Sequence, residues 1–309
     1  MKTAVIVNPH SAGGKTGRQW PEIAARLTAR LGPVDARLTE RPGHATGIAR
    51  ELLGEGYDRI IAAGGDGTIN EIANGFLHEG RPLRPAACLG LIPLGTGGDF
   101  RRSLGIPNSI PEAIDILAAA SARRIDVGQA AFRALSGRTE QRYFVNLLSF
   151  GMGGEVASRA KNFLTPLGGA VGFLWATAAA LLSYRRKRVR LTLDGGAPPA
   201  SYSIYNVAAG NGRFHGGGMQ ACPTARLDDG ILEVTVIEYM SQLQVIRDFR
   251  VLYSDNVYRH PKVHHLRAHK LLAESDEPVK IEVDGEPLGT LPLEITMLPR
   301  CLPVVGSWS

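Results

Sequence analysis

The sequence predicts an α/β domain with a mainly parallel sheet over residues 1–126, followed by a β-rich domain of antiparallel, sandwich-like type over residues 127–309. Three observations support this fold class. Strand-like and helix-like patterns alternate in the first part of the chain, strand-like segments dominate the second part, and 309 residues suffice for two hydrophobic cores. The last strand is free to return to the first domain.

The first domain is built from alternating apolar runs and segments with helical periodicity, which predicts helices on both faces of its sheet. We expect strands at residues 3–9, 34–40, 57–67 and 87–95, and helices at residues 18–31, 44–56 and 68–80.

The pattern changes after "RRIDVG" at residues 123–128, where short strand-like segments follow one another with few helices between them. Such a series is typical of an antiparallel β domain. We expect strands at residues 142–151, 189–195, 201–210, 231–239, 278–286 and 293–299.

The composition is that of a folded protein, with 44% hydrophobic and 21% charged residues. The formal net charge of +6 favours an anionic partner but does not choose among nucleic acid, nucleotide and anionic membrane. Three scattered cysteines form no disulfide or zinc motif, and the first residues are too short in apolar length for a signal peptide. We therefore expect a cytoplasmic protein.

The segment from Asn162 to Tyr184 carries no charge and is followed directly by "RRKRVR". The alternative is a membrane span, but Pro166 and neighbouring glycines interrupt the first third of the segment. The remaining helix, from about Ala170, is short and rich in alanine, which favours a buried or lipid-facing helix. The basic run suits contact with an anionic membrane surface better than a nucleic-acid patch.

Three glycine-rich turns follow predicted strands of the first domain: "NPHSAGGK", "GGDGTINEI" and "PLGTGGDF". Ligands gather at the carboxyl ends of parallel strands, where glycine lets backbone N–H groups approach phosphate. Asp66 would lie too close to a polyphosphate without a cation, so it is a candidate Mg²⁺ ligand. The alternative is that Asp66 only stabilises a turn.

These three motifs, with "ARLDDGILEV" and "VDGEPL" further along, resemble the soluble bacterial diacylglycerol kinase family, which comprises lipid kinases related to sphingosine kinases. The resemblance spans essentially the whole chain and implies an α/β nucleotide-binding domain followed by a β-rich lipid-substrate domain. This sequence departs from the family pattern at Gly98, where the family usually has Asn. Any contact that the Asn side chain makes in the family is therefore in doubt here.

The resemblance implies sets of ligand residues. A structural Mg²⁺ would be bound by Asp229 with backbone oxygens of Arg226 and Ile231, near Asp99. Lys15 and Arg18 would face phosphate or lipid. ATP would lie against Asn8, Pro9, His10, Ser11, Ala12, Lys15, Thr39, Gly64, Gly65, Asp66, Gly67, Thr68, Asn70 and Thr96.

The catalytic base is assigned to the "VDGEPL" motif, with Glu286 placed slightly ahead of Asp284. On a regular strand, residues two apart project to the same face. The alternative is a hairpin turn at Asp284–Gly285, which residues alone would favour. The histidines at 260, 264, 265 and 269 are expected to be structural, because their spacing on a strand does not converge on a metal.

The implied activity is that of an ATP-dependent lipid kinase, which transfers the γ-phosphoryl group to a hydroxyl of a diacylglycerol-like lipid with ATP and Mg²⁺. The expected location is cytoplasmic with peripheral membrane association, with no nucleic-acid partner and with the oligomeric state, including a homodimer, left open. The alternatives are a soluble-substrate kinase of the NAD kinase type and a membrane-associated nucleotide-binding protein without turnover.

Overall fold

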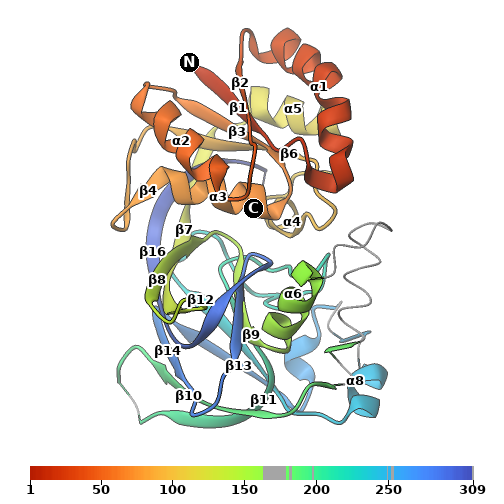
Figure 1. The fold of residues 1–309 in the computed structure, drawn as a ribbon, viewed down its shortest axis with the longest axis vertical. Coiled ribbons are helices and arrows are strands. Elements are labelled where there is room, and N and C mark those ends of the chain that lie inside the picture. The colour runs from red at the N-terminus through yellow and green to blue at the C-terminus, as the bar shows by residue number, and fades with distance from the viewer. Residues whose placement is uncertain (163–178, 181–182, 197, 249, 252–253, 308–309) are drawn as a thin grey trace. The chain divides into compact units, whose positions relative to one another are not determined.

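The computed structural model describes residues 1–162, 179–180, 183–196, 198–248, 250–251 and 254–307. Figure 1 draws the chain as a ribbon. The chain divides into two compact units. The first comprises Met1–Val127 together with Pro299–Ser309, and the second comprises Gly128–Leu298. Two long strands, β7 (Ala122–Ala134) and β16 (Glu286–Val305), contain the two unit boundaries.

The sheet of the first unit has the strand order β6-β3-β1-β2, with the end of β16 next to β6. These strands are β1 (Thr3–Val7), β2 (Asp35–Leu38), β3 (Arg59–Gly64) and β6 (Cys88–Pro93). Each of the neighbouring pairs is parallel. Every residue of β1, β3 and β6 is buried, which explains their continuous apolar sequences.

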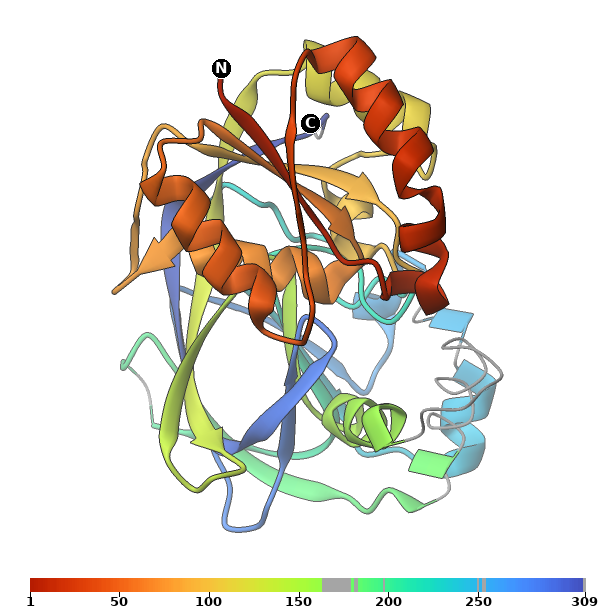
Figure 2. The ribbon, with the colours of Figure 1, turned by 45° about the horizontal axis from the view of Figure 1, so that its top comes forward.

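Helices cover the sheet of the first unit, as Figures 1 and 2 show. Helices α1 (Lys15–Leu31) and α5 (Ile110–Ala119) pack together, as do α2 (His44–Gly54) and α3 (Asp66–Phe76). Ser109 caps α5 by accepting a hydrogen bond from the backbone N–H of Glu112. The short helix α4 (Asp99–Ser103) and the small hairpin β4 (Leu77–His78) with β5 (Arg81–Pro82) complete the unit.

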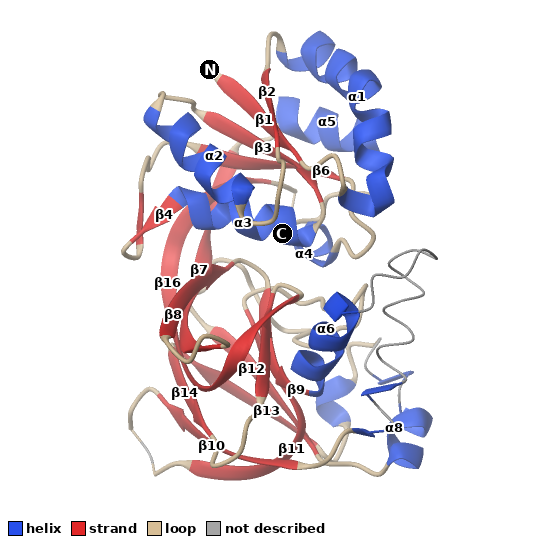
Figure 3. Ribbon diagram, in the orientation of Figure 1, coloured by secondary structure: helices blue, strands red, loops and turns tan. Residues whose placement is uncertain are grey.

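The second unit is rich in β structure, as the red strands of Figure 3 show. Its registered strand pairs are antiparallel. The main strand path is β13-β12-β11-β10-β14-β16, and β9 pairs with both β11 and β15. Their bounds are β8 (Thr139–Phe144), β9 (Leu147–Gly151), β10 (Lys187–Leu193), β11 (Ala200–Gly210), β12 (Leu232–Glu238), β13 (Val263–Ala268), β14 (Lys270–Glu274) and β15 (Lys280–Val283).

The core of this unit is formed by alternating apolar side chains of these strands, among them Phe144, Phe150 and Ile281, all fully buried. Helices α6 (Met152–Asn162) and α8 (Gln242–Asp248) and the 3-10 turn at Val257–Arg259 lie in the same unit. The predicted strand at residues 142–151 is two strands, because the chain leaves the β pattern at Val145 and Asn146.

The helix predicted from about Ala170 falls mostly on residues 163–178 and 181–182, which lie outside the described residues. Among the helices that the structure describes, none has the length and apolar character needed to cross a membrane.

Candidate functional site

The first glycine-rich turn, after β1, is joined to the second, after β3, by a side-chain contact. The Asn8 Nδ2 group donates to Thr68 Oγ1 over 3.0 Å, and Asn8 Oδ1 accepts from the backbone N–H of His10 over 3.0 Å. Asn8 therefore fixes the turn of its own loop and ties that loop to the start of α3.

The second and third turns approach each other through glycines. A Cβ atom built on Gly95 would lie 2.4 Å from the Cα of Gly65. No side chain fits at that distance, so this close approach requires glycine. All three turns, at the carboxyl ends of β1, β3 and β6, are thus brought together at one edge of the sheet.

Asp66 is the first residue of α3, and its carboxylate binds the third turn. Oδ2 accepts from the N–H groups of Gly98 (2.8 Å) and Asp99 (3.4 Å), and Oδ1 accepts from Phe100 N–H (3.2 Å). These three groups begin helix α4, where a negative charge is favourable. Asp66 therefore caps α4 from the start of α3. The alternative in which Asp66 only stabilises a turn anticipated this contact in part.

Asp66 and Asp99 are candidate Mg²⁺ ligands of this turn. Burial, followed by the Asp99 charge, raises the pKa of Asp66. Asp99 is itself buried and forms an ion pair with Arg102 at 3.1 Å. Within the described residues, no three metal-binding side chains gather into a cluster. The two carboxylates would still fit Mg²⁺ if phosphate bound at these turns, because Mg²⁺ takes few protein ligands and keeps phosphate oxygens and waters.

The other residues assigned to ATP differ in how far they are exposed. His10, Lys15 and Thr96 are exposed. Thr39 and Asn70 are buried, and the Thr39 N–H donates to the Val7 carbonyl over 2.9 Å. The remaining members are partly or fully buried in the turns themselves: Asn8, Pro9, Ser11, Ala12, Gly64, Gly65, Gly67 and Thr68.

Glu71, which the sequence analysis did not single out, holds the loop between β2 and α2. Its buried carboxylate accepts from the N–H groups of Gly43 (2.8 Å) and Ala45 (3.1 Å). These N–H groups lie at the start of α2 and have no partner within the helix. The Glu71 side chain therefore fixes the loop that follows Thr39, and the only signal in the sequence was its place in "GGDGTINEI".

In the second unit, Asp284 and Glu286 do not lie two apart on a regular strand, so the expectation of a shared strand face was wrong. Strand β15 ends at Val283 and pairs with Glu286 at the start of β16. Asp284 and Gly285 form the two-residue turn between them, with φ values of 46° and 88°. Two successive positive φ values are the signature of the hairpin turn for which Asp–Gly is preferred.

The turn holds the two carboxylates in different surroundings. Asp284 is buried, and its oxygens accept from the N–H groups of Leu147 (2.8 Å) and Val145 (3.2 Å). Glu286 is partly exposed and forms an ion pair with Arg142 at 3.0 Å. Asp284 is thus fixed by the backbone, whereas Glu286 is neutralised by a cation.

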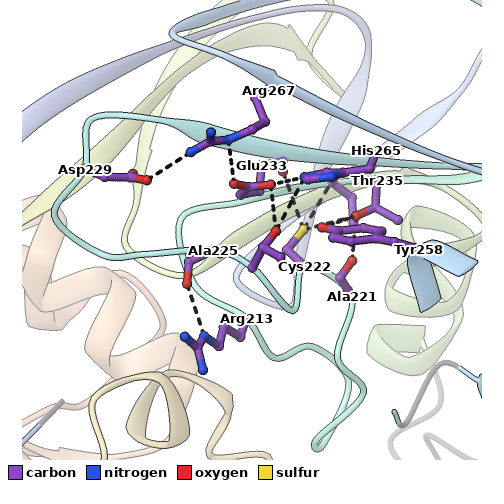
Figure 4. A network of polar contacts seen from close by, with 12 residues as sticks. Arg213, Ala221, Cys222, Ala225, Asp229, Glu233, Thr235, Tyr258, His265 and Arg267 are labelled. Carbon is purple, nitrogen blue, oxygen red and sulfur yellow. Dashed lines mark hydrogen bonds and ion pairs between the residues drawn. The ribbon is translucent and has the colours of Figure 1, made fainter. Parts of the chain in front are cut away.

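The "LDDG" turn belongs to a polar network that Figure 4 shows. Asp229 accepts from the Ile231 N–H over 3.1 Å, and Arg267 Nη2 lies 3.4 Å from its other oxygen. Arg267 also contacts the buried Glu233, which accepts from His265 as well. The Asp229 carboxylate therefore faces a guanidinium cation. Arg226 and Ile231 lie in the same unit, and Asp99 belongs to the first unit.

Comparison with known proteins identifies both halves of the chain. Residues 2–130 match the model of the diacylglycerol kinase catalytic domain, and residues 146–306 match that of the YegS C-terminal NAD kinase beta sandwich-like domain. A diacylglycerol kinase of Staphylococcus aureus strain MRSA252 is 30% identical over 304 residues, which are 98% of this chain and 91% of that protein. The chain belongs to the diacylglycerol kinase family. It is a lipid kinase.

Further relatives agree with this assignment. A diacylglycerol kinase of Staphylococcus saprophyticus is 29% identical over 94% of this kinase and 90% of the relative. A solved structure assigned as a diacylglycerol kinase from Bacillus anthracis has a TM-score of 0.76 and 26% identity, covering 99% of this kinase and 97% of that chain. Yeast NADH kinase in complex with NADH has a TM-score of 0.55 and 13% identity, over 100% and 84% of the two chains, and shares the fold alone.

Proposed function

We propose that this kinase transfers the γ-phosphoryl group of ATP to the hydroxyl of a diacylglycerol-like lipid. The observation that carries the nucleotide part is the convergence of three glycine-rich turns at the carboxyl ends of β1, β3 and β6. Their contacts Asn8–Thr68, Gly65–Gly95 and Asp66–Gly98 hold the three turns together at the carboxyl ends of the parallel strands, where a polyphosphate is expected to bind.

The residues of this chain supply mainly positioning, because phosphoryl transfer depends on alignment and charge neutralisation. Lys15 is exposed at the start of α1, beside the first turn, where it can meet phosphate. Bound Mg²⁺, with Asp66 and Asp99 as its candidate protein ligands, would neutralise charge on the phosphates.

We assign the general base to Asp284 rather than to Glu286. A base has to be held in place with its carboxylate available for the proton of the lipid hydroxyl. Two backbone N–H groups hold Asp284, whereas Arg142 offsets the charge of Glu286. This assignment reverses the slight preference drawn from the sequence.

The test of the base compares Asp284→Asn with Glu286→Gln under saturating lipid. A general base contributes about 10²–10⁴-fold to the rate, so kcat of Asp284→Asn should fall by that order while the KM for ATP stays near its wild-type value. Glu286→Gln should retain most of kcat. A larger loss in Glu286→Gln would return the role to Glu286, and equal losses in both variants would contradict the assignment to Asp284 alone.

The substrate is tested by transfer of labelled phosphate from ATP to diacylglycerol, a sphingoid base and phosphatidylglycerol in mixed micelles, with NAD as a parallel acceptor. Label in diacylglycerol above the other lipids supports the proposal. Label in NAD would establish the soluble-substrate alternative, and tight ATP binding without label in any acceptor would establish a binding protein without turnover.

A further inference from the structure

His215 lies in a loop of the second unit that the proposed reaction leaves without a role. The loop residues Gly216, Gly217 and Gly218 have φ values of 60°, 89° and 117°. His215 and Met219 close the loop by two backbone hydrogen bonds of 2.9 and 3.0 Å. Three successive left-handed positions demand glycine, so the sequence "HGGGM" builds a tight loop that presents one histidine.

The imidazole of His215 faces a carboxylate that is almost completely removed from water. His215 Nε2 lies 3.3 Å from Glu282 Oε1, and the Glu282 side chain is 1% exposed. Glu282 Oε1 also accepts from Ser149 Oγ over 2.7 Å, and Oε2 accepts from the Gly285 N–H over 2.7 Å. A buried carboxylate is costly unless it is paired, and these three groups supply its partners.

Glu282 therefore connects His215 to the turn that carries Asp284. Gly285, whose N–H group it accepts, is the second residue of that turn. A second connection runs through Asn146, which lies between the two residues that hold Asp284. Its Nδ2 group donates to the Phe214 carbonyl over 3.0 Å, next to His215.

We propose that His215 is a positioning residue for the proposed base: with Glu282 it fixes the Asp284–Gly285 turn, and so the carboxylate that receives the lipid proton. The inference rests on the proposed function. His215 acts through Glu282 and the Gly285 N–H, while the Val145 and Leu147 N–H groups hold Asp284 from the other side.

The deciding variant is His215→Phe, which keeps an aromatic ring and removes the nitrogen that faces Glu282. Small displacements of a reacting group cost up to about 10²-fold, so kcat should fall by about 10- to 100-fold while the KM for ATP and ATP binding stay unchanged. His215→Gln, which returns an amide N–H donor, should recover part of that loss. His264→Phe removes another histidine paired with a glutamate, Glu238 at 2.8 Å, and should leave kcat unchanged.

A second readout measures the turn itself and needs no activity. In hydrogen exchange, the amide of Gly285 should exchange faster in His215→Phe than in the wild type or in His215→Gln, with the exchange of β11 amides unchanged. Unaltered kcat and Gly285 exchange in His215→Phe, or an equal kcat loss in the Phe and Gln variants, would overturn the proposal.

The two proposals fail in different ways. If wild-type protein phosphorylates lipid and Asp284→Asn is inactive, but His215→Phe behaves as wild type, the positioning role is wrong and the proposed function stands. If wild-type protein phosphorylates no lipid, both the function and the positioning role that rests on it are overturned, whatever the exchange experiment gives.

Discussion

The carboxylate of Asp66 binds the third turn although its surroundings disfavour the ionised form. Its carboxylate organises the third turn, yet burial and the neighbouring Asp99 raise its pKa, so the ionised form is less stable in the folded protein than in the unfolded chain. A carboxylate that is held at a cost where polyphosphate is expected is consistent with a functional site.

The first prediction follows from the sign of that pKa shift. The folded protein holds the Asp66 proton more tightly than the unfolded chain, so this group's contribution to stability is full below its ordinary pKa of 3.8 and is lost as pH rises through the raised value. Asp66→Asn should remove this loss. The free energy of unfolding, measured in urea from pH 4 upward, should therefore fall less with pH in Asp66→Asn than in the wild type, and an identical pH dependence would contradict the assignment.

Gly98 occupies a position where the diacylglycerol kinase family usually has Asn. The backbone conformation at this position explains why either residue is accommodated. Its φ and ψ are 65° and 36°, a left-handed conformation that Gly adopts freely and Asn tolerates. A Cβ there would lie 2.7 Å from Nε of Arg101, a flexible side chain that is able to move.

We therefore predict that Gly98→Asn keeps ATP binding and the free energy of unfolding close to wild type. Gly98→Val is the matched comparison, because a β-branched side chain in this conformation costs about 1–2 kcal/mol. Calorimetric ATP binding and urea unfolding of both variants test this. If Asn and Val are equally damaging, side-chain volume rather than backbone conformation decides the position.

At the scale of elements, α2 depends on a side chain from α3. Glu71→Ala would leave the N–H groups of Gly43 and Ala45 without their acceptor. Ala45 is buried, and an unsatisfied buried donor costs about 1–3 kcal/mol. We predict a loss of that order in the free energy of unfolding, measured in urea. Glu51→Ala, which changes an exposed glutamate of α2 itself, is the control and should change stability by a few tenths of a kcal/mol at most.

The elements also show where sequence patterns suffice. The buried strands β1, β3 and β6 are largely apolar runs followed by glycine-rich turns, so their place and the turns after them could be predicted. Asp284 shows the limit: an Asp–Gly pair within an alternating segment fits both a strand and a hairpin, and only the pairing of Val283 with Glu286 decides between them. Glu71 and His215 were missed because their partners lie 28 and 67 residues away.

At the scale of the whole molecule, the basic run that follows residue 184 is only partly available to an anionic surface. Lys187 pairs with Glu277 at 2.8 Å and Arg190 with Asp276 at 2.8 Å. Arg185, Arg186 and Arg188 are exposed, and within the described part of the chain their side chains form no ion pair. The composition reveals the excess of positive charge, but dividing the charged residues into paired and unpaired groups requires the structure, because their partners lie far away in the sequence.

We predict that the unpaired arginines contribute to membrane binding. A basic residue near an anionic surface is worth about 1 kcal/mol, so replacing Arg185, Arg186 and Arg188 by Gln should weaken binding to phosphatidylglycerol vesicles by roughly 100-fold. Binding of the wild type should also fall as salt rises. The Lys187→Gln, Arg190→Gln double variant is the control and should lose much less. Equal binding of all three proteins at low salt would exclude this surface.

The order in which the residues of this kinase are synthesised differs from the order in which the strand pairing of its two units can be completed. The first unit needs the end of β16, where Leu302 and Val304 are fully buried and Val304 pairs with Leu89 of β6. These residues are translated after the whole second unit. Residues 1–127 therefore keep an unpaired strand edge at β6 until the last residues have been synthesised. A nascent chain, or a fragment that stops at residue 127, exposes that edge to pairing with other chains.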